Sequence, residues 1–139
     1  MKKIAYLLMV FTTVTMISCK EEKKEKENTQ MKLVMAIHDE VMPKMSTLGS
    51  MVKELSDKED STEIGIEHKQ AREGLQASHK SMMDWMQGFG NRFDSDEILN
   101  GKALSEEKQK WLNEEEGKIR ALREQINTSI ENAKLLLKE

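Results

Sequence analysis

Three titratable side chains are spaced so that they could meet inside a helical fold: His38, His79 and Glu115. If the chain folds back on itself near residues 58–59, the two histidines lie at similar distances from that turn and come level with each other. A second connection centred near residue 97 then brings Glu115 to the same level. Glu115 also shares a helical face with Leu122, so we expect it to point inward.

Two interpretations of this cluster stay open. In the first, the imidazoles donate hydrogen bonds to Glu115 and fix the register of the helices, because a buried carboxylate must be compensated. In the second, His38, His79 and Glu115 bind a divalent metal such as zinc, cobalt, nickel or copper(II). Met42 and Met83 would lie near by, and their thioethers favour copper(I). The cofactor implied by the second interpretation is a copper or zinc ion.

Methionine is the other frequent potential ligand, with 11 residues in the chain. Seven of them should gather at one end of the predicted hairpin. They are Met31, Met35, Met42, Met45, Met82, Met83 and Met86. Methionines of this kind usually fill gaps in a core, but they also form adaptable surfaces for a partner helix. Core packing, a partner surface and a copper site all remain compatible with the pattern.

Apolar residues recur at helical spacing in three segments, which position these side chains. The pattern predicts helices over residues 31–57, 62–89 and 104–138. Short connections make successive helices antiparallel neighbours, so we predict an all-α, up-down-up three-helix bundle over residues 31–139. Pro43 lies inside the first segment and should kink it, because proline lacks an N–H and crowds the preceding turn.

The N-terminal segment has the pattern of a secretory leader. Lys2 and Lys3 precede an apolar stretch, Ile4 to Ile17, and Ser18-Cys19 closes it. We therefore expect residues 1–18 to be a signal peptide. Cys19 is the only cysteine of the chain, which excludes a disulfide within it.

The end of the leader, Met16-Ile17-Ser18-Cys19, resembles the bacterial lipobox. Met16 departs from that pattern, in which leucine is commoner. The resemblance implies that Cys19 is the lipidation site: its thiol is diacylglycerylated and the leader is cleaved before it. Several acyl chains on one residue anchor a protein stably to a membrane.

A run of lysine and glutamate follows Cys19, and no apolar residue interrupts it between residues 20 and 27. Such a run cannot bury a face in a core, so residues 19–30 should be the lipidated cysteine followed by a disordered tether. Cys-Lys-Glu-Glu also resembles the surface-export signal of lipoproteins in the Bacteroidota. That resemblance implies an outer-membrane lipoprotein, on either the periplasmic or the outer face.

Composition and missing motifs narrow the function. A net charge of −3 without a basic face argues against nucleic acid as a partner. The sequence lacks a phosphate-binding glycine loop, and its only cysteine is assigned to the lipid. We therefore expect a non-enzymatic protein whose partners are the membrane, through Cys19, and an envelope protein.

The segments Met35–Met45 and His79–Phe93 look like those of uncharacterised small helical lipoproteins of Flavobacteria and other Bacteroidota. Some of these carry the label "viral A-type inclusion protein", which reflects coiled-coil character. The resemblance implies a lineage and a compartment, and no activity. We expect a membrane-anchored envelope lipoprotein that acts as a helical binding module. The alternative is a metal-binding protein for sequestration or sensing.

Overall fold

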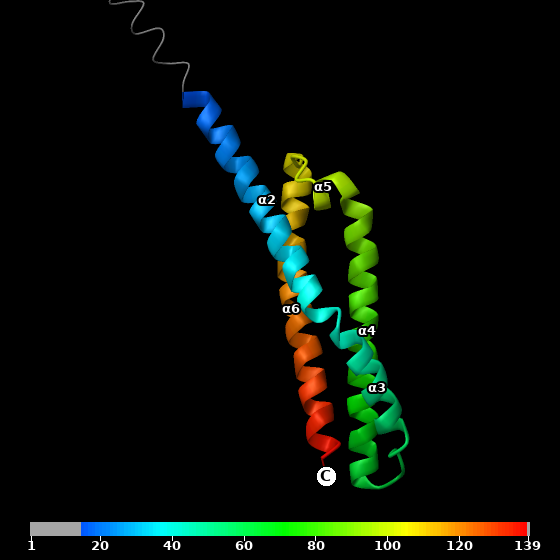
Figure 1. The fold of residues 1–139 in the computed structure, drawn as a ribbon. Helices are drawn as coiled ribbons and strands as arrows, with labels where there is room; N and C mark the ends of the chain where they lie inside the picture. Colours follow the sequence, from blue (N-terminus) through cyan, green and yellow to red (C-terminus); the bar gives the residue numbers. More distant parts are fainter. Residues whose placement is uncertain (1–14, 139) are drawn as a thin grey trace, which may run out of the picture.

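The computed structural model describes residues 15–138 of the chain, and its regular secondary structure there consists of helices joined by turns and short loops. Its helices are α2 (Thr15–Val41), α3 (Lys44–Ser56), α4 (Glu63–Arg92), α5 (Ser95–Leu99) and α6 (Glu106–Leu136) (Figure 1). No strand occurs among these residues. The predicted all-α class is therefore confirmed. Residues 1–14, which hold most of the predicted signal peptide, lie outside the described part.

The first predicted helix is broken into α2 and α3 at Pro43. Helix α2 ends at Val41 and α3 begins at Lys44, with Pro43 at its N-terminal cap. The amide of Met45 donates to the carbonyl of Met42 at 3.1 Å and closes a turn at the break. The predicted kink at this proline is confirmed, and Figure 1 shows α3 continuing downward from α2 with a sideways step.

The charged segment after Cys19 differs from its prediction as a disordered tether. Its backbone belongs to α2, which runs without interruption from Thr15 through the charged run. Lysine and glutamate are good helix formers, and Glu22 and Lys26 have the i,i+4 spacing that favours a helix. A helix already formed from Met31 onward can also be extended without a new nucleation step. These local preferences explain how a segment without apolar residues becomes helical.

Helix α4 continues past Gly88 and Gly90, which lie on either side of its predicted end at residue 89. It begins after Thr62, whose hydroxyl accepts a hydrogen bond from the amide of Gly65 at 3.1 Å, and it ends at Arg92. The side chain of Phe93 is buried in the core just beyond that end. Asp94 then caps α5, whose Glu97 completes a capping box with it.

The long helices pack as an elongated body. Helices α4 and α6 lie side by side over much of their length and run in opposite directions (Figure 1). Helix α2 packs mainly on α6, whereas α3 packs mainly on α4. The bend at Pro43 therefore lets one arm of the chain cross from α6 to α4.

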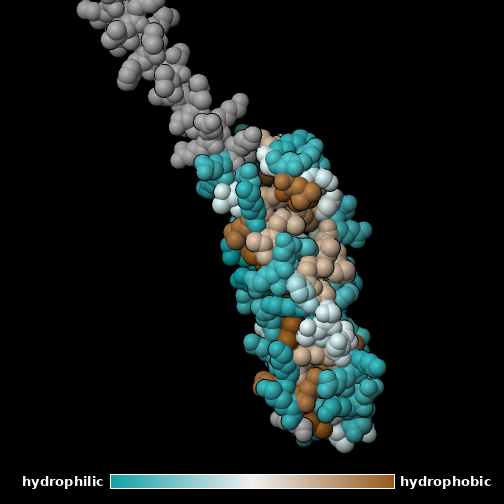
Figure 2. Space-filling view, viewed as in Figure 1, coloured by the Kyte–Doolittle hydropathy of each residue, from teal (hydrophilic) through white to brown (hydrophobic). Residues whose placement is uncertain are grey.

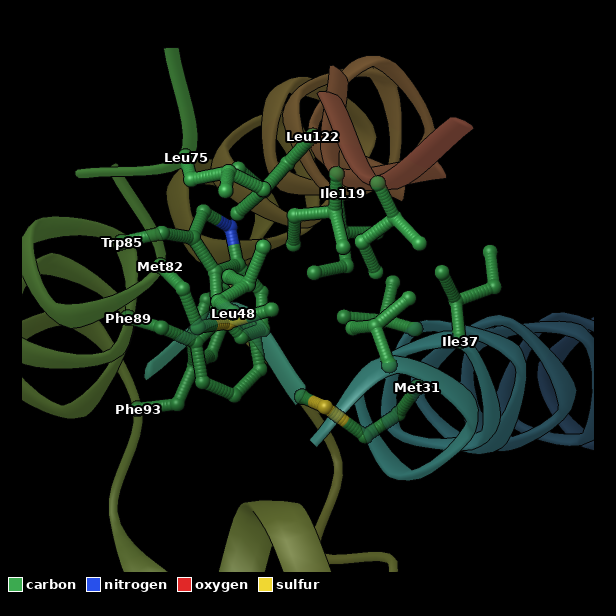
Figure 3. Packing of buried hydrophobic residues seen from close by; sticks show 14 of the residues in the cluster. Met31, Ile37, Leu48, Leu75, Met82, Trp85, Phe89, Phe93, Ile119 and Leu122 are labelled. Carbon is green, nitrogen blue, oxygen red and sulfur yellow. The ribbon is translucent and has the colours of Figure 1, made fainter. Parts of the chain in front are cut away.

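The core is built from aliphatic residues and a ladder of aromatic rings on α4. Trp85 stacks on Phe89 with ring centroids 4.9 Å apart, and Phe89 contacts Phe93 at 4.8 Å (Figure 3). Among the side chains that the structure describes, every buried apolar one lies between Met31 and Ala133. Burial of apolar area drives folding, and the chain from Lys20 onward contains the whole of this described core.

The face of this body that Figure 2 shows is mostly hydrophilic, with scattered apolar side chains. Among the exposed apolar residues are Leu33, Ile64, Ile66, Met83, Met86, Leu99 and Leu135. Among the helices of residues 15–138, none combines the length and the apolar character that crossing a membrane requires.

Candidate functional site

Glu115 is the one member of the predicted cluster that is deeply buried, with 2% of its surface exposed. Its Oε1 atom accepts hydrogen bonds from Arg92 Nη1 at 2.9 Å and from Lys118 Nζ at 2.8 Å. The predicted inward orientation is confirmed. The expectation that histidines compensate the carboxylate is wrong, because two cations do so.

Arg92 is the centre of this polar group, and the sequence interpretation missed it. Its Nη1 atom also donates to Glu114 at 2.8 Å, and its guanidinium lies 5.4 Å from the ring centroid of Trp111. Arg92 is in the last turn of α4, where a cation is also favoured by the helix dipole. The sequence pattern predicted the end of this helix at residue 89, so it did not place Arg92 in the last turn of α4.

His38 lies at the edge of the core and is not among the side chains that hydrogen-bond to Glu115. Its ring stacks obliquely against Trp85 with centroids 5.9 Å apart, and Nδ1 is 2.9 Å from Asp39 Oδ1. The side chain is about 15% exposed. His38 therefore packs between α2 and α4 and forms a local polar contact on the surface.

His79 is exposed, contrary to the predicted inward position. Its neighbour Ser78 is fully buried and lies 2.8 Å from Ser129 of α6, Oγ to Oγ. Each residue turns the side chain by about 100° around a helix. Because Ser78 faces α6, the next residue is rotated toward the solvent.

The three predicted metal ligands therefore do not form one site. Within residues 15–138, no three His, Cys, Asp or Glu side chains lie close enough together to hold a metal ion. Of the two predicted thioether ligands, Met42 is half-buried against the core and Met83 is 38% exposed. The register was wrong on α4, since His79 and Met83 both lie outside the buried face.

The seven methionines predicted to cluster differ in their burial. Met31 and Met82 are part of the core, and Met35, Met42 and Met45 are packed against it. Met83 and Met86 are exposed on α4. Most of the group thus has the core-packing role, and two members remain available at the surface.

A shallow groove runs along the seam between α4 and α6, with a volume of about 470 Å³. This volume is within the range of small-molecule sites, roughly 300–1,000 Å³. The groove is lined by Ser81, Asp84, Trp85, Gly88, Glu115, Lys118, Ala121, Leu122 and Gln125. Gly88 and Ala121 present little or no side chain, which explains the hollow between two otherwise well-packed helices.

Trp85 brings an unusual feature to this groove. Its side chain is 8% exposed, and its Nε1 donor is buried without a hydrogen-bond partner in the described part of the chain. Figure 3 shows the indole nitrogen turned toward α6, on the side where Leu122 lies. An unpaired buried donor costs about 1–3 kcal/mol, so a partner for it would be stabilising.

A second polar group joins α2 to α6 on another side of α6. Gln30 Nε2 donates to Asn113 Oδ1 at 2.9 Å and to Glu116 Oε2 at 2.8 Å. The hydrogen bond from Gln30, helped by one from Arg120, lowers the pKa of Glu116 below its ordinary value. This contact holds α2 at the point where it joins the packed body.

Cys19 falls within the backbone of α2, but its side chain lies outside what the structure describes. The predicted lipidation of its thiol and the predicted cleavage after Ser18 therefore stay predictions.

Comparisons with protein-family models, with curated proteins and with solved structures find no match for this chain.

Proposed function

We propose that this protein is a cell-envelope lipoprotein, anchored through lipid on Cys19, whose helical body acts as a non-enzymatic binding module. The observation that carries the proposal is the sequence Met16-Ile17-Ser18-Cys19 at the end of an apolar leader. A sole cysteine at that position has an evident use in lipidation and none in a disulfide.

In this proposal the described helices work as an up-down-up three-helix bundle. Helices α2 and α3 count as one arm bent at Pro43, and α4 and α6 supply the other two. The packing of α2 on α6 and of α3 on α4 supports this arrangement. Binding is supported by the groove between α4 and α6 and by the exposed Met83 and Met86, since methionines form adaptable contact surfaces.

The resemblance to lipoproteins of the Bacteroidota supports the outer membrane as the location, on its periplasmic or its outer face. The lysine and glutamate run directly after Cys19 carries that part of the proposal. No observation in the described residues favours the metal-binding alternative over binding by the groove.

Mass spectrometry of the protein purified from membranes tests the anchor. We expect a mature chain that begins at Cys19 and carries a diacylglyceryl group, and incorporation of labelled palmitate into the same band. A Cys19→Ala variant should lose both the label and the cleavage. An unlabelled chain with its leader attached would overturn the proposal.

A further inference from the structure

The groove between α4 and α6 combines an apolar floor with a hydrogen-bond donor that has no partner. Trp85 and Leu122 supply the apolar surface, and Gly88 leaves the space above them open. The Nε1 atom of Trp85 is fully enclosed among groups that do not accept a hydrogen bond from it. Trp85 and Leu122 both line the groove, and the indole nitrogen is turned toward the side where Leu122 lies (Figure 3), so this donor is enclosed beside the groove.

The charges along the groove are already neutralised by neighbours within the chain. Glu115 is paired with Arg92 and Lys118, and Asp84 accepts a hydrogen bond from Lys80. An ionic ligand would have to compete with these pairs, whereas an uncharged one would not. The paired charges of the groove therefore disfavour an ionic ligand, and the unpaired Trp85 Nε1 favours a ligand with a hydrogen-bond acceptor.

We propose that this groove binds an uncharged amphipathic small molecule whose apolar part rests on Trp85 and Leu122. Its carbonyl or ether oxygen accepts a hydrogen bond from Trp85 Nε1 once the Leu122 side chain has turned aside. This inference deepens the proposed binding function by naming the site and the ligand class. It rests on that function for its biological meaning, but its test does not depend on the lipid.

The test uses Nile red, an uncharged aromatic dye with a carbonyl acceptor, and the chain from Lys20 onward, which contains the whole described core. Dye fluorescence gives the affinity, and the indole resonance of Trp85 in ¹H–¹⁵N spectra reports the hydrogen bond. We expect saturable binding with a shift of that resonance. A Trp85→Phe variant keeps the ring and loses the donor, so its affinity should fall about fivefold.

Two glycines of α4 provide a matched pair of variants. Gly88 lines the groove and Gly90 does not, yet both are exposed and a Cβ added to either meets no atom within 4 Å. Gly88→Leu should fill the groove and weaken dye binding at least tenfold, whereas Gly90→Leu should leave it unchanged. Circular dichroism confirms that both variants remain folded.

Equal affinity of the wild-type chain and Gly88→Leu would overturn the proposal, as would binding that leaves the Trp85 resonance unmoved. An equal loss in both glycine variants would place the dye elsewhere and would also overturn it. None of these results bears on lipidation of Cys19, so failure of the groove and failure of the anchor are distinguishable.

Discussion

A buried carboxylate stabilises a fold only while its charged partners are present. The two partners of Glu115 differ in their exposure and in the helix they come from. Arg92 lies across the helix seam and is about 30% exposed, whereas Lys118 comes from the same helix and is 54% exposed. We expect Arg92→Met to lower the free energy of unfolding by about 2 kcal/mol, since it leaves the buried charge of Glu115 with Lys118 as its remaining cationic partner. Urea denaturation of the two chains measures the difference.

The control for this prediction is Lys118→Met, which removes the more exposed partner and should cost less than about 1 kcal/mol. A second Glu115→Gln substitution should recover part of the loss in Arg92→Met, because the uncompensated charge is removed. If Lys118→Met lowers the free energy of unfolding as much as Arg92→Met does, then the Arg92–Glu115 pair between the two helices contributes no more than the pair within α6.

Gly65 is a position where a single methyl group has no room. A Cβ there would lie 2.6 Å from the amide nitrogen of Asp60 and 2.8 Å from its carbonyl oxygen. We expect Gly65→Ala to destabilise the protein by about 1–3 kcal/mol through overpacking. Gly90→Ala has open space and should be neutral or stabilising by up to about 1 kcal/mol. Thermal melts in which both variants behave alike would contradict the prediction.

At the site, the inward orientation of Glu115 could be predicted from the sequence, but the exposure of His79 and the pairing of Glu115 with Arg92 could not. Glu115 is four residues from Trp111 and seven from Leu122, and this spacing placed it inside. Its partner Arg92 depended on how far α4 extends beyond Gly90, which is decided by burial of Phe89 and Phe93. That is a tertiary effect, and a local pattern does not report it.

At the scale of elements, α2 is tied to α6 through a contact that depends on pH. The pKa of Glu116 is lowered below its ordinary value of 4.5, first by the hydrogen bond from Gln30 and then by Arg120. A carboxyl group with a lowered folded pKa stabilises the fold above its unfolded pKa. That stability is lost as the pH falls through the folded pKa. We expect unfolding to become easier as the pH drops below about 4.5, as measured by urea denaturation across pH.

A Glu116→Gln variant should show a weaker pH dependence in that acidic range, because the titrating group is absent. Gln30→Ala keeps the Glu116 carboxyl group and removes the hydrogen bond that lowers its pKa most, so it should weaken the pH dependence in the same direction. A Glu116→Gln profile that matches the wild type would refute this role for the contact.

The elements show which parts of the fold a sequence can specify. The break at Pro43 follows from covalent chemistry, and it was predicted because no packing can restore the missing N–H. The start of α6 after Ser105 follows equally from local capping, with the Ser105 side chain accepting from the amide of Lys108. The exposure of His79 follows instead from which face of α4 meets α6, and the apolar pattern left that undecided.

At the scale of the whole molecule, α2 extends beyond the core it helps to build. Its contacts with α6 include Gln30, and Met31 is the first buried apolar residue among those of its side chains that the structure describes. The backbone remains helical back to Thr15 (Figure 1). Met31 is twelve positions after Cys19, so a helix would place Cys19, the proposed anchor, about 18 Å from the start of the core. A flexible tether of the same sequence would fix no such distance.

A proline at residue 27 tests whether this extension is a helix that grows out of the core. We expect Cα chemical shifts of residues 20–26 to be helical in the chain from Lys20 onward. Glu27→Pro should convert them to random-coil values, because proline blocks propagation and seven residues cannot nucleate a helix alone. Residues from Met31 onward should keep their shifts, since packing on α6 holds them.

Glu27→Ala makes the same change of charge without blocking the helix, so it should retain helical shifts throughout residues 20–26. Random-coil shifts in the wild-type chain would show that the charged run is a flexible tether, as its composition alone predicts. Loss of helix in Glu27→Ala as well would assign the order to the charge pattern. The proline and alanine variants thus distinguish two causes of the helix: propagation out of the folded core, and stabilisation by local ion pairs. Only propagation out of the core makes the distance between Cys19 and the core a property of the fold.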